Sequence, residues 1–285
     1  MPLPFPVIDA LFDPAPRNVW TSSSPAPDGP PPEPPPRRCF AQPEELAVCM
    51  KNAGVRQALV TQCRVWNCER QPLCAEQRAD DVLKFVRAAP QRFVGVAGFN
   101  PFDIAAALRE MEELADTGGF RGVYSNAQTY AISAADRRLY PLYAKAGELG
   151  WPVVVQCSAP VALLEVPQLA NDFPELPMVA ALRSWPERGL MERLAEQAEN
   201  VFFLAPARMV GADLLKILST PAGERLIWAT DGIAWKRATD QLATLGIAPS
   251  LLRRYAFENA EQVFHLSEKI SVKAAVAGET MAAER

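Results

Sequence analysis

The sequence predicts a single (β/α)8 barrel. Eight short apolar runs, rich in β-branched and aromatic residues, alternate with amphipathic stretches of helical period. The length of 285 residues suits one α/β barrel of roughly 250 residues with additions. Continuous apolar strands are typical of parallel sheets buried on both faces. An open, doubly wound sheet is the alternative, but no glycine-rich phosphate loop follows any predicted strand.

The predicted strands are spaced along most of the chain. They are 7–10, 57–61, 93–97, 119–124, 152–156, 178–181, 201–204 and 226–229. The clearest predicted helices between them are 104–115, 137–149, 188–198 and 212–218. Because strand and helix alternate throughout, a closed parallel barrel is favoured.

Two segments depart from this alternation. Residues 14–36, after the first strand, carry a dense run of prolines that favours extended polyproline over helix. In a barrel this loop would lie over the carboxyl ends of the strands, as a lid, an interface arm or a solvated insertion. Residues 267–285 are rich in Ala, Glu and Lys, which predicts a disordered tail. We therefore expect the barrel to occupy residues 1–266.

Composition argues against several classes of partner. The formal net charge is −4, and no basic run exceeds Arg37-Arg38, so a nucleic-acid surface is not expected. No apolar stretch approaches the ~20 residues that cross a bilayer. The first residues show no secretory signal. We expect a cytoplasmic protein that binds neither nucleic acid nor membrane, and whose six cysteines are reduced thiols.

Polar side chains stand at the ends of the predicted strands. In a barrel these ends meet at one mouth, so the side chains should converge there. They are Asp13, Cys63, Tyr124, Gln156, Cys157, Arg183 and Asp231. Arg64, Arg183 and Arg208 each follow a strand, where they either clamp an anion by their fork geometry or form loop salt bridges.

Cysteines and tryptophans add further candidates in the same loops. Cys63, Cys68 and Cys74, together with Cys157, would bind a soft metal, form a redox pair or supply a thiolate, unless they are buried inert thiols. The single histidine, His265, lies beyond the last strand, so a cysteine–histidine pair is excluded. Trp66, Trp185 and Trp235 follow strands and would form an aromatic-walled pocket or a hydrophobic interface.

Several strand regions resemble a known family. The segments at 7–13 (Val-Ile-Asp-Ala-Leu-Phe-Asp), 119–123 (Gly-Phe-Arg-Gly-Val), 150–155 (Gly-Trp-Pro-Val-Val-Val) and 226–231 (Leu-Ile-Trp-Ala-Thr-Asp) occur in the family's order. They are similar to strands of the amidohydrolase-2 (ACMSD-like, amidohydrolase-related) family of metal-dependent hydrolases. The resemblance covers roughly residues 5–266 and implies an amidohydrolase-like TIM barrel.

The chain departs from that family at the metal ligands. The resemblance places family histidines at Leu11, Asp13, Gln156 and Leu182, and only Asp231 of the usual set remains. A zinc or manganese site of this type needs imidazole nitrogens with carboxylate support, which one distant histidine does not supply. We therefore expect no metal and no other cofactor. A new metal site built from Asp13, Asp231 and Cys157 is the remaining alternative.

Three functions of different classes fit these observations. The first is a metal-independent hydrolase or lyase acting on a small anionic or aromatic substrate, with Asp231 as general base. The resemblance implies this role through a metal-independent lactonase branch, although Asp231 would otherwise be a structural carboxylate. The substrate-binding residues would be Arg183, Gln156, Tyr124, Asp13, Trp66, Cys63, Cys157 and Arg208.

The other two functions involve no chemistry. One is an inactive pseudoenzyme subunit that pairs with an active related barrel, and the other is a small-ligand binding protein. Fold alone does not decide among the three. The polar strand ends favour the enzyme, and a homodimer or a heteromer with a related barrel is expected.

Overall fold

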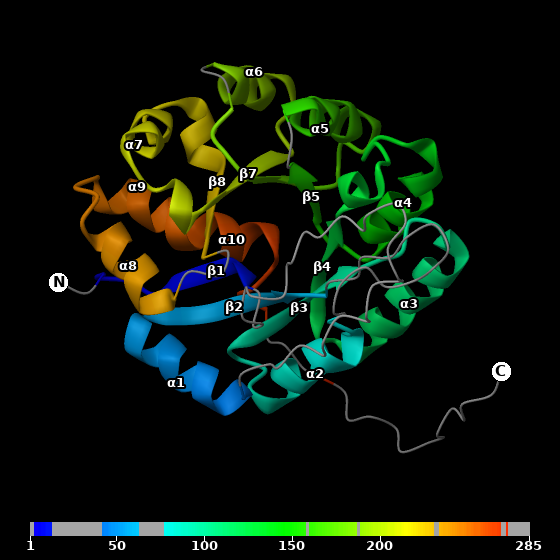
Figure 1. The fold of residues 1–285 in the computed structure, drawn as a ribbon, viewed down its shortest axis with the longest axis horizontal. Helices are drawn as coiled ribbons and strands as arrows, with labels where there is room; N and C mark the ends of the chain where they lie inside the picture. The colour runs from blue at the N-terminus through cyan, green and yellow to red at the C-terminus, as the bar shows by residue number, and fades with distance from the viewer. Residues whose placement is uncertain are drawn as a thin grey trace, which may run out of the picture.

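The computed structural model describes residues 3–12, 42–62, 77–157, 160–186, 189–230, 234–268 and 272. Eight parallel strands form a nearly closed ring, with helices around the outside (Figure 1). The strands are β1 (Val7–Phe12), β2 (Val55–Thr61), β3 (Phe93–Gly98), β4 (Phe120–Ser125), β5 (Val153–Cys157), β6 (Met178–Leu182), β7 (Val201–Pro206) and β8 (Leu226–Ala229). The predicted (β/α)8 barrel is therefore confirmed.

Helices follow the strands and cover their outer faces. They are α1 (Pro43–Ala53), α2 (Ala79–Ala88), α3 (Ile104–Thr117), α4 (Tyr140–Glu148), α5 (Pro160–Asp172), α6 (Leu190–Gln197), α7 (Ala212–Leu218), α8 (Trp235–Ala243), α9 (Pro249–Arg253) and α10 (Asn259–Val263). A π-helical turn, Arg254–Glu258, joins α9 to α10. None of the helices in the described ranges has the length and apolar character of a membrane span.

Local sequence explains where these elements begin and end. The side chain of Asp103 accepts a hydrogen bond from the backbone N–H of Ala106 at 3.1 Å and caps the start of α3. Gly118 ends the same helix with φ 70°, a left-handed conformation that favours glycine. The predicted helix 137–149 divides into a 3-10 turn, Arg137–Leu139, and α4, because Pro141 at the start of α4 lacks the N–H that would continue the turn.

Ladders of parallel pairs join each strand to the next from β1 to β8. The strands are buried on both faces, as their apolar sequences predict. Just after α10, the fully buried Phe264 packs against Gly122 of β4. In barrels of this kind a site is expected at the carboxyl ends of the strands.

The proline-rich segment 14–36 lies outside the described residues, and so does most of the predicted tail 267–285. The domain limits that we expect from the sequence stay predictions. The described strands and helices run from Val7 to Val263 within one barrel.

Candidate active site at the barrel mouth

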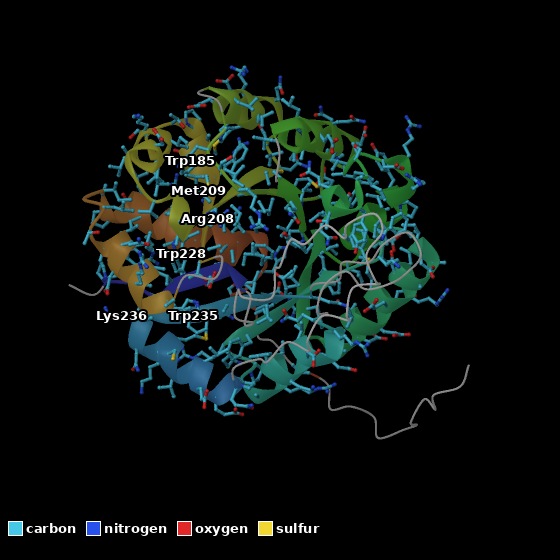
Figure 2. All side chains as sticks on the ribbon, viewed as in Figure 1. Trp185, Arg208, Met209, Trp228, Trp235 and Lys236 are labelled. Carbon is cyan, nitrogen blue, oxygen red and sulfur yellow. The ribbon has the colours of Figure 1, made fainter. Side chains whose placement is uncertain are left out.

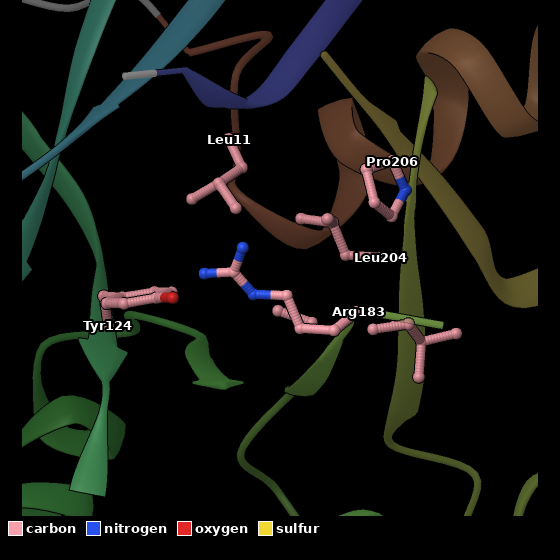
Figure 3. Close-up of a pocket in the computed structure, with 7 residues that line it drawn as sticks. Leu11, Tyr124, Arg183, Leu204 and Pro206 are labelled. Atoms are coloured by element: carbon pink, nitrogen blue, oxygen red, sulfur yellow. The ribbon is translucent and has the colours of Figure 1, made fainter. Parts of the chain in front are cut away.

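A pocket opens at the carboxyl ends of the strands (Figure 3). The space between the lining side chains, including the part that is open to solvent, amounts to about 230 Å³. Its walls come from β1, β4, β6 and β7, so strands on opposite sides of the ring build it. The lining residues are Leu11, Tyr124, Ala181, Leu182, Arg183, Leu204 and Pro206.

Arg183 supplies the positive charge of this pocket. It follows β6 directly, and its side chain extends toward Tyr124 with Leu11 beside it (Figure 3). Arg183 is exposed, so its guanidinium is accessible to an anion from solution. A guanidinium presents paired N–H donors that match the two oxygens of a carboxylate. The pocket is therefore suited to a carboxylate.

Tyr124 and Gln156 form a hydrogen-bonded pair beside Arg183. The phenol of Tyr124 donates to Oε1 of Gln156 at 3.2 Å. The two residues are the penultimate residues of the neighbouring strands β4 and β5, and both are partly buried. The structure thus brings Tyr124 together with Arg183 in the pocket and with Gln156 through a hydrogen bond, and the sequence singled out all three.

Arg208 has a different place from the one predicted. Its guanidinium donates to the backbone carbonyl of Arg183 at 3.2 Å and to that of Leu182 at 3.5 Å. Nearby, the indole N–H of Trp185 donates to the carbonyl of Met209 at 3.1 Å (Figure 2). These bonds tie the end of β6 to the turn after β7. Arg208 therefore supports the backbone that carries Arg183 and does not line the pocket.

Cys157 also stands apart from the pocket lining. Its thiol is buried and donates to the backbone carbonyl of Val155 at 3.5 Å. Burial, with a smaller contribution from the negative charge of Glu165 on α5, raises the pKa of the thiol to about 12. A thiol with this pKa is not a nucleophile at neutral pH. The inert-thiol interpretation fits Cys157 best.

Asp9 was missed in the sequence interpretation. This carboxylate of β1 is fully buried. Its Oδ1 accepts the backbone N–H of Thr230 at 2.8 Å, and its Oδ2 accepts the Thr230 hydroxyl at 2.5 Å and the indole N–H of Trp235 at 2.7 Å. Burial raises its pKa to about 6, although the bonds from Thr230 and Trp235 oppose the shift. The sequence feature that could have identified Asp9 is its position as the one acidic residue in the apolar sequence of β1.

Four predicted site residues lie outside the described part of the chain. They are Asp13, Cys63, Trp66 and Asp231. The same holds for Arg64, Cys68 and Cys74. Their assignment to the mouth stays a prediction from the sequence.

The described residues at this mouth do not include the imidazole donors of the family's metal site, since the one histidine of the chain is His265. Of the positions to which the resemblance assigns ligands, Leu11 and Leu182 are aliphatic, and the amide of Gln156 is bonded to Tyr124. The described ranges hold no group of three His, Cys, Asp or Glu side chains arranged for a metal ion. His265 is exposed, and it is not among the residues that line the pocket.

The fold and the pocket together define a class of protein: a (β/α)8 barrel with a pocket, lined by one arginine, at the carboxyl ends of its strands. The amidohydrolase family model matches residues 8–266, and the chain therefore belongs to the amidohydrolase family. A comparison with curated protein sequences finds no match.

Solved structures of several proteins share the fold. A TIM-barrel protein of Bordetella bronchiseptica has 22% identity and a TM-score of 0.65, covering 79% of this chain and 83% of its own. The 2,6-dihydroxybenzoate decarboxylase of Rhizobium has 15% identity and a TM-score of 0.65, covering 93% and 100%. A Pseudomonas putida protein named as a 2-pyrone-4,6-dicarboxylic acid hydrolase has 18% identity and a TM-score of 0.63, covering 93% and 99%. At these identities the likeness shows the fold.

Proposed function

We propose that this protein is a metal-independent hydrolase or lyase that acts on a small anionic or aromatic substrate, with Asp231 as general base. The observation that carries the proposal is the meeting of Arg183 and Tyr124 in one pocket, with Gln156 hydrogen-bonded to the phenol of Tyr124. Aliphatic side chains at two ligand positions of the family support the metal-independent part.

Each described side chain has a defined role in this proposal. The guanidinium of Arg183 binds a substrate carboxylate through paired N–H donors. Tyr124 and Gln156 bind a second polar group of the substrate, since a phenol and an amide both donate and accept. Leu11, Leu204 and Pro206 pack against the flat apolar part.

Asp231 performs the proton transfer in the hydrolytic version. A water molecule attacks the substrate carbonyl carbon while Asp231 takes one of its protons, and the same proton then passes to the departing oxygen. Asp231 immediately follows Thr230, whose backbone and hydroxyl are both fixed by Asp9. In a lyase version, the bond between the ring carbon and the substrate carboxylate breaks, CO2 leaves, and the ring carbon takes up a proton that the carboxyl group of Asp231 delivers from solvent.

The substrate panel for the test follows from the proteins that share the fold. It consists of carboxylated lactones, scored by ring opening, and hydroxybenzoates, scored by release of CO2. Arg183→Gln should weaken binding of the active compound by about 10- to 100-fold, the usual worth of a charge-assisted pair. Arg183→Lys should weaken binding less, because lysine keeps the positive charge and loses only the paired N–H donors of the guanidinium. Arg87→Gln, on the exposed face of α2, is the control.

Asp231→Asn should reduce turnover by about 100-fold or more while leaving binding nearly unchanged. Turnover that survives this substitution, or binding that is indifferent to Arg183→Gln, would contradict the proposal.

The pseudoenzyme is the second candidate, favoured by the aliphatic residues at Leu11 and Leu182. It predicts that no compound of the panel is turned over and that the protein co-purifies from its native host with an active related barrel. The binding protein predicts that a panel compound stabilises the fold and is recovered unchanged. Light scattering on the purified protein tests the expected homodimer.

A further inference from the structure

The ladder between β6 and β7 stops just before Arg183. Its last pair joins Ala181 to Leu204, while β6 continues to Leu182 and β7 to Pro206. Arg183 is the next residue after β6. The backbone that carries its side chain therefore lies beyond the last ladder pair with β7.

Two side chains join the two segments where the ladder stops. The guanidinium of Arg208, in the turn after β7, donates to the backbone carbonyl of Arg183 at 3.2 Å and to that of Leu182 at 3.5 Å. In the opposite direction, the indole N–H of Trp185 donates to the backbone carbonyl of Met209 at 3.1 Å. Trp185, Arg208 and Met209 accordingly lie beside one another in Figure 2. Each segment gives one side chain to the backbone of the other, and we call this arrangement the β6–β7 clasp.

The clasp bears on the pocket through Arg183. The side chain of Arg183 lines the pocket and extends toward Tyr124 (Figure 3). A guanidinium pairs with a carboxylate through two parallel N–H bonds only when its plane faces both oxygens at the right distance. A displacement of the backbone that carries the guanidinium therefore weakens this pair, even when the charge is unchanged.

We propose that Arg208 is a positioning residue for the anion anchor: together with Trp185 it holds the backbone of Arg183, so that the Arg183 guanidinium meets a substrate carboxylate with both N–H donors. This inference rests on the proposed role of Arg183 and extends it. Arg208 is not among the residues that line the pocket, so it acts through the backbone of Arg183. The role concerns binding and is measured without turnover.

An arginine suits this task because its N–H donors lie in one fixed plane and reach two neighbouring carbonyl oxygens at once. The same device occurs at the amino-terminal end of β8. There Nη1 of Arg225, the residue before β8, donates to the carbonyl of Ala195 at 2.8 Å and to that of Ala198 at 2.7 Å. None of these three residues lines the pocket. Arg225 is therefore a matched control for Arg208.

The test compares binding of an anion with binding of a neutral compound of the same shape. The probes are the monohydroxybenzoates and the corresponding hydroxybenzamides, and calorimetry measures their affinities. The variants are Arg208→Gln, Arg208→Lys and Trp185→Phe, with Arg183→Gln as the reference for loss of the anchor and Arg225→Gln as the control. Melting temperatures are recorded for all of them.

Arg208→Gln should weaken binding of the benzoates by about three- to tenfold and leave binding of the benzamides within about twofold, because only a carboxylate uses both guanidinium donors. Arg208→Lys should give a smaller loss, since lysine keeps a donor but not the planar pair. Trp185→Phe should also weaken the benzoates selectively, although it changes no charge. Arg225→Gln should lower the melting temperature and leave both affinities within about twofold.

Salt separates positioning from the charge of Arg208 itself. The ratio of wild-type to Arg208→Gln affinity for the benzoates should persist at about 0.5 M NaCl, where interactions between separated exposed charges are screened. A ratio that falls to one at this salt concentration, with Trp185→Phe binding as the wild type does, would assign Arg208 a charge effect and overturn the positioning role.

Two further results would overturn this role alone. One is benzoate affinity equal to that of the wild type in Arg208→Gln and Trp185→Phe while Arg183→Gln loses it. The other is an equal loss for benzoates and benzamides, which general structural support would give. Benzoate binding that is absent from the wild type, or that Arg183→Gln does not change, would remove the anchor of the proposed function and the role of Arg208 with it.

Discussion

Burial controls the ionisation of two side chains near the carboxyl ends of the strands. Burial disfavours the charged form of Asp9 and so raises its pKa. Burial raises the pKa of the Cys157 thiol as well, and that thiol stays protonated. Both shifts have consequences that can be measured one residue at a time.

The pKa of Asp9 predicts a pH-dependent stability. Its pKa is raised from 3.8 to about 6 in the folded protein, so between these values the folded state binds more protons than the unfolded state. Stability from this group is therefore greatest below pH 4 and is lost as the pH rises through about 6. The difference amounts to about 3 kcal/mol at 1.36 kcal/mol for each pH unit.

Urea unfolding of the wild type and of Asp9→Asn across this range measures the effect. The free energy of unfolding of the wild type, relative to the variant, should rise as the pH falls from 7 toward 4. A difference between the two proteins that does not change with pH would show that the ionisation of Asp9 is not perturbed.

Cys157 should resist alkylation in the folded protein. Burial raises the pKa of its thiol to about 12, so at pH 8 almost none of it is thiolate, and the reagent has no access. Mass spectrometry after iodoacetamide treatment should find Cys157 unmodified in the native protein and modified in urea. The exposed Cys49 of α1 is the internal control. Rapid native labelling of Cys157 would contradict the burial.

At the scale of elements, the end of β2 and the end of β3 approach each other closely. The backbone N–H of Gly98 donates to Oε1 of Gln62 at 3.2 Å. A Cβ at Gly98 would lie 2.4 Å from the backbone carbonyl oxygen of Gln62, so the backbone itself would have to move.

Gly98→Ala should therefore destabilise the protein by roughly 1–3 kcal/mol, as overpacking does. Gly147→Ala is the matched control, since Gly147 lies in α4 with nothing within 4 Å of an added Cβ. There alanine should be neutral or mildly stabilising. Thermal unfolding of both variants measures the contrast, and equal melting temperatures would contradict this packing.

The sequence predicted the strands better than the site. All eight were found, because apolar β-branched runs report burial on both faces. Their carboxyl ends extend further in several cases: β7 was predicted to end at Leu204 and runs to Pro206, since ladder pairs continue into residues that break the apolar pattern.

Strand ends alone do not reveal which way each side chain faces. Gln156 meets Tyr124, whereas the adjacent Cys157 is buried near α5, because successive side chains of a strand point to opposite faces. The importance of Asp9 could not be predicted, since its partners Thr230 and Trp235 are more than two hundred residues away in the chain.

At the scale of the whole molecule, the barrel keeps the family's architecture. A guanidinium and a phenol meet in a pocket with aliphatic walls, and two positions to which the resemblance assigns metal ligands carry leucines. In the proposed function, the positive charge that binds an anion belongs to Arg183.

Elemental analysis of the purified protein, paired with a substrate assay before and after chelator treatment, tests metal independence most directly. The expected result is less than about one transition-metal ion per ten chains, with turnover unaffected by the chelator. One zinc or manganese ion per chain, together with activity that the chelator removes and the metal restores, would contradict the account.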